Sequence, residues 1–106
     1  MMAWVVLVMA GTFEVGWPVG LKLAQDSNTR VQGIVIALLF MVLSGTLLWV
    51  AQRQIPMGTA YAVWTGIGAA GTFMVGVTYY GEAASLMRFL GLALIIAGVV
   101  VLKLAR

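Results

Sequence analysis

The chain has 106 residues, of which 63% are hydrophobic and only 8% are charged, with a mean hydropathy of +1.09. A soluble domain carries about 25% charged residues, so this composition indicates an all-α membrane protein and excludes an ordinary soluble domain. The formal charge of +3 is spread over segment ends and gives no basis for nucleic-acid binding, and the absence of cysteine and histidine excludes thiol redox chemistry, Cys/His metal sites and histidine-based triads.

Four apolar segments follow one another along the chain, at residues 3–21, 32–52, 58–80 and 85–102. Each is close to the ~20 residues that a helix needs to cross the hydrocarbon of a bilayer. They predict four transmembrane helices in a single domain over residues 1–106. No basic region precedes the first segment, so we expect it to be retained rather than cleaved as a signal peptide. A bacterial inner membrane is the expected location.

Glu14 is the only acid well inside an apolar segment, since Asp26 and Glu82 fall in predicted loops. A charged side chain at membrane depth costs at least a few kcal/mol and usually has a function. Positions three and four apart share a helix face, so Gly11 is expected to open space one turn before Glu14. Trp17 would place an indole N–H one turn after it. The alternative is that Glu14 pairs with a Lys or Arg of another helix, although no basic residue lies at a matching depth.

Pro18 lies one helical turn beyond Glu14 in the same segment. Because proline has no N–H, the Glu14 carbonyl group loses its helical partner, and we expect the helix to bend at this point. Proline is also tolerated in membrane helices for no functional reason when neighbouring groups satisfy the freed carbonyl.

The next two segments each add polar or aromatic candidates. Ser44, midway along the second segment, is a hydroxyl donor at membrane depth, although such serines often bond back to their own helix. In the third segment, Tyr61, Trp64, Thr65 and Gly68 share one face at helical spacing. Aromatic belts at the membrane surface explain most Tyr and Trp residues of membrane proteins, but Trp64 lies several residues inside its segment.

The fourth segment has Gly91 and Gly98 one heptad apart, with no polar group deeper than Lys103. This pattern is typical of a helix–helix contact rather than of a binding site. Four helices provide too little wall to enclose a polar path within one subunit. We therefore expect the chain to form an oligomer.

The basic residues are balanced between the two sides of the membrane. Four helices place Arg53, Lys103 and Arg106 on one side and Lys22, Arg30 and Arg88 on the other. Orientation in the membrane follows Lys/Arg asymmetry, so three against three gives no preference. Either another signal fixes the orientation, or copies of the chain insert in both orientations.

Several motifs together resemble the small multidrug resistance family over essentially the whole chain. They are Glu14-Val15, Leu21-Lys22, Gly81-Glu82 and the specific block IPMGTAYAVWTGIGA at residues 55–69. Trp17 and residues 64–68 resemble the guanidinium-exporter branch, whereas the branch that exports polyaromatic drugs usually has a small or hydroxyl residue at the position of Trp17. Two features depart from the pattern: Pro18 stands where alanine is more usual, and the first loop lacks a Gly-Phe pair before Thr29.

The resemblance implies an antiparallel, dual-topology homodimer that couples export to proton entry. In that pattern the Glu14 carboxylates of both copies form one shared site, and Trp17, Ser44, Tyr61 and Trp64 surround them. Two adjacent buried carboxylates favour their protonated forms, and an entering cation favours the charged forms and expels the protons. Competition for one pair of carboxylates, combined with alternating access, gives antiport. Guanidinium fits such a site because it is planar and its N–H groups match a carboxylate.

Three rival functions use the same residues differently. A promiscuous exporter of quaternary ammonium compounds is the nearest alternative. A passive cation channel would use Glu14 without proton coupling, and a non-transporting assembly subunit would pair Glu14 with a basic residue of another membrane protein. No enzymatic activity and no cofactor are expected, because the sequence holds no nucleophile–base pair and no metal-ligand set.

Overall fold

The computed structural model describes residues 2–105, all of whose regular structure is helical. Five helices are present: α1 (Met2–Glu14), α2 (Gly16–Leu23), α3 (Arg30–Ala51), α4 (Met57–Tyr79) and α5 (Leu86–Leu104). Taken together, α1 and α2 make one apolar stretch, so four stretches are long and apolar enough to cross a membrane. The all-helical prediction with four such stretches is confirmed. Arg106, which entered the charge count, lies outside the described residues.

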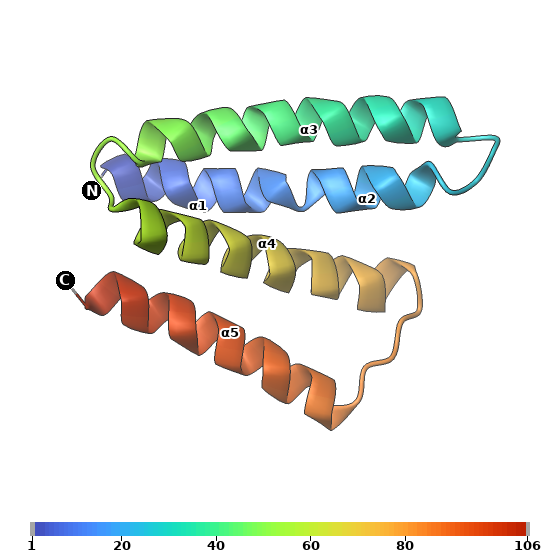
Figure 1. Ribbon diagram of the computed structural model, residues 1–106. Coiled ribbons are helices and arrows are strands. Elements are labelled where there is room, and N and C mark those ends of the chain that lie inside the picture. Colours follow the sequence, from blue (N-terminus) through green and yellow to red (C-terminus); the bar gives the residue numbers. More distant parts are fainter. Residues whose placement is uncertain (1, 106) are drawn as a thin grey trace.

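The first stretch is interrupted at Val15, at the place where the position of Pro18 predicts a disturbance. Pro18 offers no N–H to the Glu14 carbonyl group, and the neighbouring bond from Val19 N–H to the Val15 carbonyl oxygen is long, at 3.4 Å. Val15 keeps helical dihedral angles, with φ −61° and ψ −31°. As a result α1 and α2 follow nearly one line in Figure 1. Pro18 therefore interrupts the hydrogen-bond ladder, and the bend that the sequence predicts here is slight.

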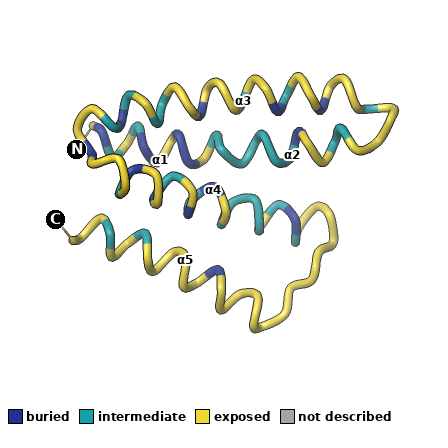
Figure 2. Tube along the Cα trace, in the orientation of Figure 1, coloured by how far each residue is buried: buried dark blue, intermediate teal, exposed yellow. Residues whose placement is uncertain are grey.

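The helices lie side by side in the order α3, α1–α2, α4 and α5 (Figure 1). Helix α1 packs against both α3 and α4, whereas α5 packs mainly against α4 and reaches α1 through the contact of Lys103 with Trp4. The molecule measures 46 × 34 × 17 Å, so it is thin in one direction. A layer of this kind leaves the side chains of α5 almost entirely exposed, with Leu92 its only buried residue (Figure 2).

Small residues set how closely the helices approach. A Cβ atom added at Gly20 of α2 would lie 2.6 Å from the Ala37 backbone nitrogen of α3, and one added at Gly33 would meet the backbone of Ala24. Backbones can approach this closely only where side chains are absent. A small apolar core lies near the start of α1, where it meets the end of α3 and the start of α4; its buried members are Ala3, Leu7, Ala51, Ile55, Ala60 and Val63.

Candidate functional site

Glu14 is the last residue of α1, and its half-buried side chain lies against Gly68 of α4. A Cβ atom added at Gly68 would overlap the Glu14 Cγ atom and would lie 3.1 Å from its Cβ atom. Gly71, the next glycine of α4, makes room in the same way for Val15. The absence of side chains on this face of α4 therefore creates the space that the carboxylate side chain occupies.

Ser44 of α3 is fully buried and joins three helices through its hydroxyl group. It donates a hydrogen bond to the Ala10 carbonyl oxygen of α1 at 2.6 Å and accepts one from the Trp64 indole N–H of α4 at 2.7 Å. The predicted alternative, in which this serine bonds back to its own helix, is wrong. The first bond joins α3 to α1 one turn before Glu14. The second holds the Trp64 ring on the same side of α4 as Gly68.

Tyr61 extends this group toward the start of α4. Its ring lies 5.4 Å from the Trp64 ring, centroid to centroid, with a tilt of 49° between the planes. Tyr61 is 56% exposed within the protomer, so its phenol group is available to a ligand or to a second chain. The predicted aromatic face of the third segment is thus present, with Trp64 on the inner side and Tyr61 on the outer side.

Gly11 and Trp17 differ from what the sequence leads us to expect. The space beside Gly11 is filled by Ile67 of α4, whose Cβ atom would lie 2.7 Å from an added Cβ. Gly11 therefore permits close packing of α1 on α4 rather than opening a cavity beside Glu14. Trp17 is half-buried on α2, and within residues 2–105 its indole N–H makes no hydrogen bond to Glu14. The indole hydrogen bond of this region comes from Trp64 instead.

The basic side chains within residues 2–105 have partners other than Glu14. Four of them lie over aromatic rings at the helix ends, as the pairs Lys22–Tyr80, Arg53–Trp49, Arg88–Phe73 and Lys103–Trp4. Arg30 donates hydrogen bonds to the Ala24 and Gln25 carbonyl oxygens. These contacts argue against a structural ion pair for Glu14 within its own protomer. Across residues 2–105, no three acidic, His or Cys side chains gather in a group that could hold a metal ion.

Gly68 is the residue of this region whose role the sequence alone did not reveal. It stood in the predicted stripe with Tyr61, Trp64 and Thr65, but glycines in a membrane helix usually indicate helix packing. The usable signal was its place on the same face as the aromatic residues. Only the packing of α1 against α4 shows that Gly68 faces Glu14, at a place where a side chain would overlap the Glu14 side chain.

Known proteins resemble this chain over nearly its full length. The family model described as Small Multidrug Resistance protein matches residues 2–95. The chain belongs to the small multidrug resistance family. Among its relatives in that family, the guanidinium exporter of Yersinia pseudotuberculosis serotype I is 51% identical over 104 residues, covering 98% of this chain and 99% of the relative. The guanidinium exporters of Citrobacter freundii and Proteus vulgaris are 47% and 44% identical over the same length.

Membership of the small multidrug resistance family confirms the resemblance seen in the motifs. Together with four stretches able to cross a bilayer, it makes the chain a multi-pass membrane protein of transport type. The relatives named above are exporters, which agrees with the expectation of transport rather than enzymatic catalysis.

Proposed function

We propose that this protein exports guanidinium and small substituted guanidinium cations across the bacterial inner membrane in exchange for protons. The observation that carries the proposal is the position of Glu14. It is a single carboxylate within a membrane-spanning stretch, and its side chain lies against Gly68 of α4, one turn beyond the Trp64 residue that bonds to Ser44. The names of the similar relatives support guanidinium as the cargo. Ionised carboxylates and aromatic faces are the groups that bind planar cations.

The proposed transporter is a homodimer whose two copies are antiparallel. Helix α5 packs mainly against α4 within its protomer, and Cβ atoms added at Gly91 and Gly98 would meet nothing within 4 Å. Two glycines one heptad apart on an open helix face fit a second helix closely. The balance of basic residues at the helix ends supports opposed orientations of the two copies. Such a dimer would enclose a path that the thin single layer leaves open.

The chemistry of the proposed site follows from one shared pair of Glu14 carboxylates. Without cargo, protons bind to the two carboxylates and neutralise them. An entering guanidinium ion replaces the protons, since its paired N–H groups donate to both oxygens of a carboxylate. Protons and cargo then occupy the site in turn, so the inward movement of protons drives the outward movement of cargo.

An exporter of quaternary ammonium compounds is the second candidate, supported by the description of the matched family as one of small multidrug resistance. The exposed Tyr61 ring could contact a bulky apolar cation. The two candidates differ in the need for N–H donors. Guanidinium recognition requires them, whereas a quaternary ammonium ion has none.

Transport currents for cations that differ in their N–H groups distinguish the two candidates. We expect proteoliposomes to give comparable currents for guanidinium and methylguanidinium, because one edge of methylguanidinium keeps its paired donors. Hexamethylguanidinium, which has no N–H group, should give a current lower by on the order of 100-fold or more, since the carboxylates would stay without hydrogen bonds. Equal currents for all three cations would show that hydrogen bonding does not select the cargo and would favour the quaternary ammonium candidate.

Changing the balance of basic residues between the two sides of the membrane tests dual topology. Three lysines added to the loop at residues 52–56 should force one orientation and lower transport by roughly tenfold or more, because opposed pairs become rare. Co-expression with a copy carrying three lysines in the loop at residues 24–29 should restore transport. A reporter fused to the C-terminus of the unmodified chain should read both sides of the membrane. A reading from one side only would contradict dual topology.

A further inference from the structure

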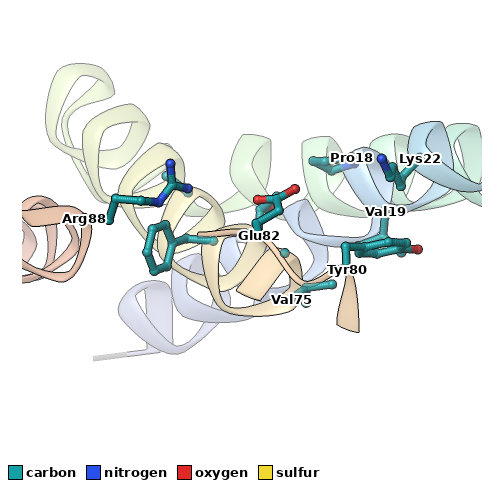
Figure 3. A pocket seen from close by; sticks show the side chains of 11 residues that line it. Pro18, Val19, Lys22, Val75, Tyr80, Glu82 and Arg88 are labelled. Carbon is teal, nitrogen blue, oxygen red and sulfur yellow. The ribbon is translucent and has the colours of Figure 1, made fainter. Parts of the chain in front are cut away.

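A cluster of charged side chains, separate from Glu14, lies where the loop between α4 and α5 meets the end of α2. There the protein has a cavity of about 320 Å³. The charged residues of its lining, Lys22, Glu82 and Arg88, come from this loop and the adjoining helix ends, and this end of the cavity is called its mouth below. Figure 3 shows Glu82 between the two basic residues. The rest of the lining is mostly apolar, with Pro18 and Ala69 among its residues.

Part of the cavity lining belongs to the surroundings of Glu14. Pro18 follows Glu14 by one helical turn, and Ala69 follows Gly68, against which the Glu14 side chain lies. From Ala69 to Gly76, both in the cavity wall, α4 rises about 10 Å. The cavity thus extends from the loop toward the site proposed for the cargo.

Glu82 is held at the mouth by its backbone. Gly81 has a φ of +65°, which glycine adopts without steric cost. The Glu82 N–H then donates a hydrogen bond to the Gly76 carbonyl oxygen at 3.0 Å. A Cβ atom added at Gly76 would overlap Oε1 of Glu82, so the carboxylate lies directly over that glycine. Substitution of the Glu82 side chain would leave this backbone hydrogen bond intact.

The two basic groups of the mouth lie on aromatic faces. Lys22 Nζ is 5.5 Å from the centre of the Tyr80 ring, and Arg88 Cζ is 5.1 Å from the centre of the Phe73 ring. The Arg88 side chain ends in the same chemical group as the proposed cargo. The cavity lining therefore already holds a planar guanidinium group on an aromatic face, and the Glu82 carboxylate belongs to the same lining. With Glu82 ionised the three charged groups sum to +1, and without it they sum to +2.

We propose that this cavity is a vestibule through which guanidinium-type cations approach Glu14. Glu82 attracts the cation against the charges of Lys22 and Arg88, and the Arg88 guanidinium group competes with the cation for the Phe73 ring. This inference rests on the proposed export of guanidinium and adds a route and an entry residue to it. Because a fixed charge at a mouth acts on the local concentration of ions, its effect belongs in the KM and depends on ionic strength.

The first test compares Glu82→Gln with Asp26→Asn, which removes an acid from the first loop on the same side of the membrane, outside the cavity. Guanidinium currents in proteoliposomes should give Glu82→Gln a KM raised roughly three- to tenfold at low ionic strength with an unchanged maximal current. The rise should shrink at about 0.5 M salt, where charges are screened within several Å. Asp26→Asn should leave the KM within about twofold of the unmodified protein. An unchanged KM for Glu82→Gln at low salt would overturn the vestibule.

The second test removes the internal competitor. Arg88→Gln is combined with Arg53→Gln so that the basic residues stay balanced across the membrane, and the control pair is Arg30→Gln with Arg53→Gln. The Arg88 pair should lower the KM about threefold relative to the control, because one positive charge and one occupant leave the mouth. A lower maximal current at unchanged KM, restored by anionic lipid, would overturn the vestibule and identify a lipid phosphate as the occupant.

One further variant distinguishes a failure of the vestibule proposal from a failure of the proposed export function. Glu14→Gln, measured in the same vesicles, should carry no coupled current at any guanidinium concentration. If it carries none and the Glu82 and Arg88 variants leave the KM unchanged, only the vestibule fails. If Glu14→Gln transports normally, the proposed function fails.

Discussion

Replacing Glu14 with glutamine is expected to abolish guanidinium uptake driven by a pH difference. Glutamine has nearly the same size as glutamate, so it should fit against Gly68 as the carboxylate does. It cannot release a proton and carries no charge, so neither the proton nor the cation is bound. Uptake of labelled guanidinium into acid-loaded proteoliposomes, together with a binding measurement in detergent, checks both parts. Asp26→Asn, the loss of an acid in a loop, should leave uptake close to that of the unmodified protein.

Persisting uphill uptake would contradict the central role of Glu14. If Glu14→Gln still concentrated guanidinium when a pH difference was imposed, the coupling would have to reside in another group. Downhill flux without coupling would instead favour the passive channel among the rival functions.

Replacing Gly68 with alanine is expected to lower guanidinium transport by on the order of 100-fold, although the substitution adds a single methyl group. Alanine is a better helix former than glycine by about 1 kcal/mol, so the helix itself should be stabilised. The new Cβ atom, however, would overlap the Glu14 Cγ atom and force the carboxylate side chain to move. Displacement of a reacting or binding group by about 1 Å can cost 100-fold in rate. Transport current and thermal stability in detergent should be measured together.

Gly45→Ala is the matched control, since an added Cβ at Gly45 of α3 would meet nothing within 4 Å in the protomer. It should keep most of the transport activity. A Gly68→Ala protein with full current would show that the position of Glu14 against α4 is unimportant for transport. A Gly68→Ala protein with a large loss of thermal stability would assign the glycine to packing instead.

The sequence alone determined the number of membrane helices, their approximate bounds and the residue of greatest interest. Helix length in a bilayer is set by bilayer thickness, so runs of about 20 apolar residues reveal the spans directly. The cost of a charge at membrane depth made Glu14 conspicuous without any structural information. The interruption at Val15 could also be placed from Pro18, because the loss of one N–H acts locally. The small size of the bend could not be predicted, since it depends on Val15 keeping helical dihedral angles.

The tertiary structure decided which helix faces meet. Helical periodicity places Tyr61, Trp64 and Gly68 on one face, but it does not say which helix that face packs against. The contact of Glu14 with Gly68 and the hydrogen bonds of Ser44 join residues far apart in the chain. These contacts depend on how closely the helix backbones approach one another. Glycine and alanine residues between the helices control that distance. For that reason the Trp64–Ser44 hydrogen bond and the packing of Ile67 on Gly11 emerged only once α1, α3 and α4 were seen together.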